Sequence, residues 1–277
     1  MTPILGGYVT LTANDYFEFP AYVANPLKPA RAAVVLLQEM DQRLQCEPSQ
    51  ARGRQQRVKP ERFKIASPWR ALAEKYAALG YLAIVPSTYN RGVYGTDFSY
   101  RHEFNTSTRT WHLVRPVEPM PADKVMLDVQ AAIEHGKLNT MTGGVGLVGY
   151  CWGGLLAWRA ASELDGVSAA VIYYGGGMTL SGDASRQPLC PVMAHFPKDK
   201  RWMAESTVER FMTQQPRVAS HVYDVRRGFN VERRQAYDGQ AARLAHERTQ
   251  RFLTEHLMTP PIFELDSIIS LPQNSLY

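Results

Sequence analysis

Short, continuous apolar runs alternate along this chain with segments of helical periodicity. Residues 32–38 (AAVVLLQ) and 81–86 (YLAIVP) are almost entirely apolar, which is typical of strands covered on both faces. Further strand-like runs lie at 17–24, 145–149, 168–174, 191–196 and 219–225. Helical patterns separate most of them, at 69–79, 122–135, 152–163, 203–215 and 237–257. This alternation predicts an α/β fold with a mostly parallel central sheet and helices on both faces.

A single domain accounts for most of the chain, because no internal repeat and no Pro/Gly/Ser-rich linker divides its 277 residues. We place this domain at 1–257 and a C-terminal tail at 258–277. Two aperiodic segments, at about 41–67 and 92–121, are predicted insertions. Long loops at the carboxyl end of a sheet usually shape a pocket or a lid. The aromatic residues of 92–121 either line such a pocket or pack the insertion against the body.

Composition and short motifs argue against several classes of partner. Lys plus Arg number 31 against 26 Asp plus Glu, and the densest basic stretch, 52–64, also contains Glu61, so nucleic-acid binding is not favoured. The three cysteines do not suggest a disulfide framework, and no CxxC or HExxH spacing indicates a metal. The N-terminus lacks a signal-peptide pattern, and no apolar run approaches ~18 residues. We expect a cytoplasmic protein without cofactor, metal or membrane partner, and its oligomeric state is left open.

The segment Gly149-Tyr150-Cys151-Trp152-Gly153-Gly154 joins a predicted strand to a predicted helix. It has the G-x-nucleophile-x-G pattern of a nucleophile elbow, a sharp turn in which bulky residues beside the nucleophile would collide with neighbouring elements. The turn is expected to present Cys151 at the carboxyl end of the sheet, beside a helix N-terminus whose partial positive charge favours the thiolate. A buried structural cysteine in a tight turn is the alternative interpretation.

Several segments, in order along the chain, carry a resemblance to a known family. They are FPAYVANP, VVLLQEM, GYLAIVPSTYNR, VGLVGYCWGG, MAHF and HVYDVRRGFN. The chain resembles the dienelactone hydrolase family, a cysteine-using branch of the α/β-hydrolase fold, over about residues 15–40, 69–91 and 122–257. The resemblance implies the α/β-hydrolase fold and a small-molecule substrate.

The resemblance also implies roles for individual residues. Cys151 would be the nucleophile, and Glu39 would be the family glutamate that interacts with the cysteine. The backbone N–H groups of Met40 and Trp152 would form the oxyanion hole. For Glu39 the alternative is a strand-end carboxylate that faces water.

Arg91, in the TYNR segment, matches a family arginine that holds a substrate carboxylate. A planar guanidinium suits this role because it can donate two parallel hydrogen bonds. Tyr89, in the same segment, is predicted to lie in the substrate site as well. A loop cation without a substrate role is the alternative for Arg91.

The chain departs from the family pattern at two positions. Arg227 occupies the slot of the family histidine, in the segment VRRGFN. An ungapped alignment puts Lys200 in the aspartate slot, and a shift of one residue puts Asp199 there. Arginine stays protonated and therefore cannot relay a proton, but it can stabilise a neighbouring thiolate. We therefore expect Arg227 to tune Cys151 in an atypical triad.

Hydrolysis of a cysteine thioester also needs an activated water, which an arginine cannot provide. Glu39 is one candidate base, and His102 or His112 of the second insertion are others, whereas His195 is interpreted as structural. We predict an enzyme that acts on a lactone, an ester or a related cyclic acyl compound that is anionic and contains a ring. The alternative is a non-hydrolytic family member, either a ligand-binding pseudoenzyme or a catalyst of rearrangement or cyclisation of a bound anionic aromatic intermediate.

Overall fold

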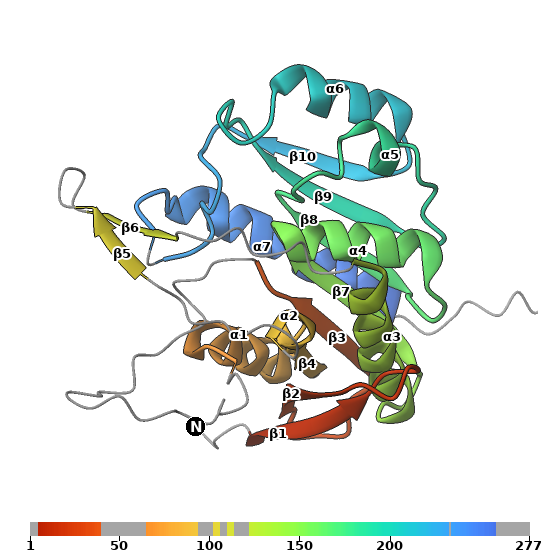
Figure 1. Cartoon of the computed structure of the whole chain (residues 1–277). Helices are drawn as coiled ribbons and strands as arrows, with labels where there is room; N and C mark the ends of the chain where they lie inside the picture. Colours follow the sequence, from red (N-terminus) through yellow and green to blue (C-terminus); the bar gives the residue numbers. More distant parts are fainter. Residues whose placement is uncertain are drawn as a thin grey trace, which may run out of the picture.

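The central sheet of the computed structural model contains eight strands in the order β1-β2-β4-β3-β7-β8-β9-β10 (Figure 1). The structure describes residues 5–39, 65–93, 102–105, 110–113, 122–232 and 234–258. The strands of this sheet are β1 (Leu5–Thr12), β2 (Glu18–Asn25), β3 (Ala32–Leu37), β4 (Leu82–Pro86), β7 (Gly144–Tyr150), β8 (Ala169–Tyr173), β9 (Val192–Pro197) and β10 (Ala219–Tyr223). β1 and β2 pair antiparallel, as do β2 and β4. The other strands of this sheet, in the spatial order β4-β3-β7-β8-β9-β10, pair parallel. The predicted α/β-hydrolase fold is confirmed.

Helices cover both faces of this sheet (Figure 1). α3 (Ala122–Leu138) and α4 (Trp152–Glu163) pack on one face, and α1 (Ser67–Ala78) and α7 (Gly239–Leu253) pack on the other. α6 (Glu205–Gln214) joins the first face through Phe211, whose ring contacts those of Trp158 and Phe196. The shorter helical segments are α2 (Asn90–Val93), α5 (Ser181–Ala184) and the π-helical turn η1 (Thr254–Met258).

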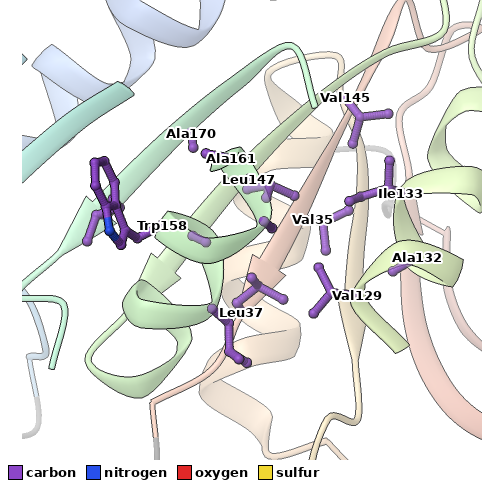
Figure 2. Packing of buried hydrophobic residues seen from close by; sticks show 14 of the residues in the cluster. Val35, Leu37, Val129, Ala132, Ile133, Val145, Leu147, Trp158, Ala161 and Ala170 are labelled. Atoms are coloured by element: carbon purple, nitrogen blue, oxygen red, sulfur yellow. The ribbon is translucent and has the colours of Figure 1, made fainter. Parts of the chain in front are cut away.

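Strand β3 lies between the two layers of the core. Its odd-numbered residues pack with α3 and α4, its even-numbered residues pack with α1 and α7, and all of them are fully buried. Figure 2 shows Val35 and Leu37 of this strand together with Val129 of α3. Because both faces are covered, β3 reads in the sequence as an uninterrupted apolar run. This packing positions the carboxyl end of β3, where Glu39 follows.

Most of the two predicted insertions and residues 259–277 of the tail lie outside the described residues. Within 92–121 the structure describes the backbone of a two-stranded hairpin, β5 (His102–Asn105) and β6 (Thr110–Leu113), in which His112 lies opposite Glu103. The division into one domain with two insertions and a tail stays a prediction.

Arg91, on α2, is held by two carboxylates. Its Nε and Nη2 donate to Asp128 of α3 at 2.7–2.9 Å, and its Nη1 and Nη2 donate to Asp15 at 2.6–2.8 Å. The guanidinium also lies 4.4 Å from the ring centroid of Phe17, and the side chain is only 6% exposed. These contacts contradict the prediction that Arg91 holds a substrate carboxylate, because its donors already bind carboxylates of the protein.

Arg91→Ala should destabilise the protein in a pH-dependent way. Removing one partner of a buried ion pair costs about 3–5 kcal/mol. Burial raises the pKa of Asp128 to about 6 even though Arg91 opposes the shift, so without Arg91 the folded state holds this proton more strongly still. A carboxyl pKa that is higher in the folded than in the unfolded state makes stability fall as pH rises above the unfolded value of ~4. Urea unfolding should therefore show a larger loss at about pH 8 than at about pH 5.

Arg159→Ala is the matched control for this prediction. Arg159 pairs with Asp183 in a more exposed position, and its loss should cost about 1 kcal/mol or less at either pH. In the double variant Arg91→Ala/Asp128→Asn the added pH dependence should disappear. An equal loss at both pH values for Arg91→Ala alone would contradict this account of the cluster.

Candidate active site

Cys151 forms the turn between β7 and α4. β7 ends at the residue before it, and α4 begins at the residue after it. The Cys151 backbone has φ 53° and ψ −113°, a conformation that costs a non-glycine residue about 1–3 kcal/mol. Its N–H donates to the Tyr173 carbonyl, and its carbonyl accepts from the Gly176 N–H, both at 2.9 Å. These bonds hold the strained turn against the carboxyl end of β8, as a nucleophile elbow requires.

Two glycines allow three backbone segments to meet at this turn. A Cβ on Gly149 would collide with the backbone of Gly153, and a Cβ on Gly153 would collide with the Leu37 carbonyl at the end of β3. Both obstacles are backbone atoms, which cannot move aside as a flexible side chain can. The G-x-C-x-G spacing therefore reflects close backbone contact, which brings the residues that follow β3 next to the elbow.

Cys151 lies in the wall of a pocket of about 590 Å³. The residue itself is only 5% exposed. Other walls of the pocket are formed by Trp152, Trp202, Met203 and Arg227. A volume of this size falls in the range of ~300–1,000 Å³ that is usual for small-molecule sites. The pocket therefore has room for a ligand next to the cysteine.

Burial raises the pKa of the Cys151 thiol above its usual value. Arg227 is the strongest influence in the opposite direction, and the Trp152 N–H and Arg234 also lower the pKa. Glu39 raises it further. Because burial outweighs the cations, the resting group is the neutral thiol. This result contradicts the expectation that the helix N-terminus and a nearby cation make Cys151 a thiolate at rest.

Glu39 is a buried carboxylate that is paired with an arginine. It is 3% exposed, and its Oε1 accepts a hydrogen bond from Nη2 of Arg234 at 2.8 Å. Glu39 is therefore not a strand-end carboxylate facing water, and its negative charge raises the pKa of the Cys151 thiol. The sequence analysis did not predict that Arg234 pairs with Glu39, because Arg234 belongs to no recognisable motif. Met40, the next residue after Glu39, lies outside the described residues.

Arg227 lies in the loop after β10 and packs on an aromatic ring. Its guanidinium carbon is 3.9 Å from the ring centroid of Trp202. Asp199 accepts a hydrogen bond from the backbone N–H of Arg227 at 3.1 Å through Oδ2, whereas Lys200 is exposed. The structure thus brings the Asp199 carboxylate next to the backbone of residue 227, and which of Asp199 and Lys200 fills the aspartate slot of the family stays a prediction.

Tyr89 lies at the edge of the elbow. Its ring centroid is 5.4 Å from that of Trp152, and its hydroxyl donates to the Gln38 carbonyl at 3.2 Å. The side chains of His102 and His112 are outside the described residues, so their proposed part in catalysis stays a prediction. The roles of Tyr89 and of the Trp152 N–H are also predictions.

His195 is fully buried in β9 and does not line the Cys151 pocket. Its Nδ1 is 2.8 Å from the Tyr223 hydroxyl, and its Nε2 is 3.0 Å from the Thr249 hydroxyl. Burial lowers the pKa of His195 well below its usual value. Both ring nitrogens are occupied, which agrees with a structural role. In the described part of the chain, no histidine lines the pocket.

Among the described residues, no group of three or more His, Cys, Asp or Glu is arranged to hold a metal ion. No helix formed by those residues is long and apolar enough to cross a bilayer.

A strained cysteine turn between a strand and a helix, at the carboxyl edge of a mostly parallel sheet, defines an α/β-hydrolase. A model of the dienelactone hydrolase family matches residues 58–257. The chain belongs to the dienelactone hydrolase family.

Individual relatives are distant. A protein of Methylorubrum extorquens, provisionally named carboxymethylenebutenolidase, is 31% identical over 133 residues, which span 46% of this chain and 41% of that relative. The chain therefore spans less than half of that protein's length. The carboxymethylenebutenolidase of Pseudomonas putida is 24% identical over 252 residues, 88% of this chain and 94% of the relative. A crystal structure from Klebsiella pneumoniae, provisionally identified as a dienelactone hydrolase, superimposes with a TM-score of 0.70 over 92% of this chain and 100% of that one, at 20% identity.

Arg227→Gln and Glu39→Gln should shift the thiol pKa of Cys151 in opposite directions. The first change removes a cation and should raise the pKa. The second removes a negative charge, leaves Arg234 unneutralised, and should lower the pKa. The measurement is the pH profile of iodoacetamide alkylation, followed by mass spectrometry of the peptide that contains Cys151. In the unmodified protein the midpoint should lie above the ~8.5 of a free thiol.

Arg226→Gln serves as the control for these two variants. Arg226 is exposed and carries the same charge as its neighbour Arg227, so its loss should leave the midpoint almost unchanged. Shifts of Arg227→Gln and Glu39→Gln in the same direction would refute this description of the electrostatics around Cys151.

Proposed function

We propose that this protein is a hydrolase of a lactone, an ester or a related cyclic acyl compound, with Cys151 as the nucleophile. The observation that carries the proposal is the position of Cys151, in a strained elbow turn and in the wall of a pocket large enough for a substrate. The relatives are named as carboxymethylenebutenolidases, which agrees with this class of reaction.

In the first step the Cys151 sulfur attacks the substrate carbonyl carbon and forms a tetrahedral oxyanion. The thiol is neutral at rest, so its proton must leave as the bond to carbon forms, and we assign Glu39 as the acceptor. Arg227 stabilises the negative charge that develops on sulfur. The N–H groups of Trp152 and Met40 are the proposed donors to the oxyanion.

In the second step the leaving alkoxide or enolate departs and water hydrolyses the thioester. Arg227 cannot accept the proton of this water because it stays protonated. Glu39, or His102 or His112 from the second insertion, is the proposed base. An enol lactone suits this site, since an enolate leaves without a strong proton donor. Deacylation is therefore expected to be the slow step.

The pocket favours an acyl group that carries a ring. Trp152 and Trp202 are aromatic residues of its lining, and Met203 and Leu180 are apolar ones. Arg227 places a positive charge in the same pocket, which favours an anionic compound over a neutral one.

A chromogenic aryl ester tests hydrolysis directly, with product release and protein mass followed together. We expect steady release that is abolished in Cys151→Ala and retained in Cys190→Ala. Cys190 is the matched control because it does not line the pocket, is partly buried, and has its pKa raised to about 11 by burial. A burst of one equivalent with a lasting mass gain on Cys151, or no release at all, would contradict hydrolytic turnover.

Arg227→His should raise ester turnover by at least about tenfold, because an imidazole can act as general base for both the thiol and the water. Asp199 is already next to residue 227 and can orient the imidazole. Adding Asp199→Asn should remove most of this gain, whereas adding Lys200→Asp should have no effect because Lys200 is exposed. Steady-state kinetics with the same ester measure these differences. A folded Arg227→His variant without any gain would show that residue 227 is not in the position of the family histidine.

A further inference from the structure

The Cys151 pocket has a buried end and an exposed end. Cys151 and Met203, which both line it, are 5% and 8% exposed. Leu180, in the same lining, is 62% exposed, and Ala204 is exposed as well. Among the described residues the pocket therefore meets solvent at Leu180 and Ala204, which we call the pocket mouth. A ligand that reacts at Cys151 and is longer than the buried end extends past this mouth.

Two helices carry the pocket mouth, and the core holds both of them. Leu180 directly precedes α5, and Ala204 directly precedes α6. The fully buried Trp158 (Figure 2) donates from its indole Nε1 to the Asp183 carbonyl of α5 at 2.7 Å. The centroid of the same ring lies 5.3 Å from that of Phe211 on α6. Because one core side chain holds both helices, a ligand meets an opening that is already formed.

The walls at the pocket mouth offer mainly apolar surface. Leu180 and Met203 are apolar, and the Thr207 hydroxyl, also in the lining, donates to the Ala204 carbonyl at 2.7 Å. A single exposed leucine is common on protein surfaces and carries no meaning by itself. In the wall of a pocket, however, a leucine loses its contact with water when a ligand covers it, and this favours an apolar group of the ligand over a charged one.

We propose that Leu180 and Ala204 form a subsite for an apolar arm of the substrate, an alkyl or aryl group that extends from the carbonyl at Cys151 toward solvent. This inference rests on the acyl chemistry proposed for Cys151. It narrows the substrate to a lactone or an ester that carries an uncharged group of several carbon atoms away from the bond that is cleaved. Leu180 supplies surface that the arm covers, and Ala204 leaves space for the arm to pass.

The expected size of the effect follows from the apolar area that the arm buries. Complete burial of one methylene group changes affinity about fourfold. At an exposed mouth only part of each methylene is covered, so we expect a gain of about twofold for each one. An arm of six carbon atoms should therefore improve binding by more than about tenfold.

Competing alkylation of Cys151 tests the subsite without any need for ester turnover. Iodoacetamide and N-hexyl-iodoacetamide both transfer their methylene carbon to the thiolate and release iodide, but only the second carries an apolar arm. The ratio of their rates at Cys151, measured by mass spectrometry and divided by the same ratio for N-acetylcysteine, cancels differences in reactivity and in thiol ionisation. We expect this ratio to exceed about ten in the unmodified protein. A ratio near one would overturn the proposal.

Leu180→Asn should lower this ratio about fivefold, because it replaces apolar surface by an amide of nearly the same size. Asparagine is also favourable directly before a helix, so the variant is expected to fold. Leu189→Asn is the matched control, since Leu189 is 71% exposed and does not line the pocket, and it should leave the ratio unchanged. If the two variants behave alike, the arm does not contact Leu180 and the subsite is wrong.

Ala204→Trp should restrict the bulk of the arm. N-adamantyl-iodoacetamide should alkylate Cys151 about tenfold more slowly in this variant than in the unmodified protein, whereas iodoacetamide should react at the same rate. Ala204→Ser keeps a small side chain and should leave both rates unchanged. If Ala204→Trp slows both reagents equally, or slows neither, Ala204 does not select the size of the arm.

A pair of aryl esters links the subsite to turnover. The hexanoate should have a kcat/KM at least about tenfold higher than the acetate, mainly through a lower KM, and Leu180→Asn should reduce this preference about fivefold. If neither ester is hydrolysed but the alkylation ratio depends on Leu180, the hydrolase proposal fails and the subsite stands. If Cys151 hydrolyses both esters without a preference for the longer chain, the subsite fails and the hydrolase stands.

Discussion

The close contact between the elbow and the end of β3 is the constraint on which the site depends. Gly153 lies against the Leu37 carbonyl so tightly that no side chain fits between them. This contact brings the segment after β3 to the cysteine turn, and with it the carboxylate of Glu39. The left-handed backbone of Cys151 is the cost of the arrangement, and it is held by hydrogen bonds to the end of β8 and by a helix that packs on the buried sheet. The geometry of the site is therefore a consequence of core packing.

Burial and charge act against each other at the Cys151 sulfur. Burial raises the thiol pKa, and Arg227 is the strongest influence that lowers it. Glu39 and Arg234 also act on the sulfur, with opposite signs, and they form an ion pair with each other. Arg227 is thus the cation that most strongly opposes the effect of burial on the thiol.

The sequence patterns predicted the central strands and the main helices, because a buried strand or an amphipathic helix is visible within a few consecutive residues. β1 was missed, since its Gly-rich sequence becomes a strand only by pairing with β2. The partners of the arginines were harder to predict. The family motif identified Arg91 by residue type, but Asp15 and Asp128, which lie 76 and 37 positions away, determine what it binds. Arg234 lies 195 positions from Glu39, and no local pattern marks such a pair.

Arg227 stands at the position that we propose for the family histidine, and it is a permanent charge, whereas a histidine there would titrate near neutral pH. In the proposed reaction this cation stabilises the developing thiolate, but it cannot accept the thiol proton. An apolar arm of the substrate at the pocket mouth displaces water from the Cys151 pocket, and it therefore raises the thiol pKa further while the substrate is present. A preformed thiolate is then disfavoured in the complex, and the proton must leave Cys151 as the carbon–sulfur bond forms. The apolar specificity proposed for the pocket mouth thus requires a proton acceptor for the thiol, which is the part that we assign to Glu39.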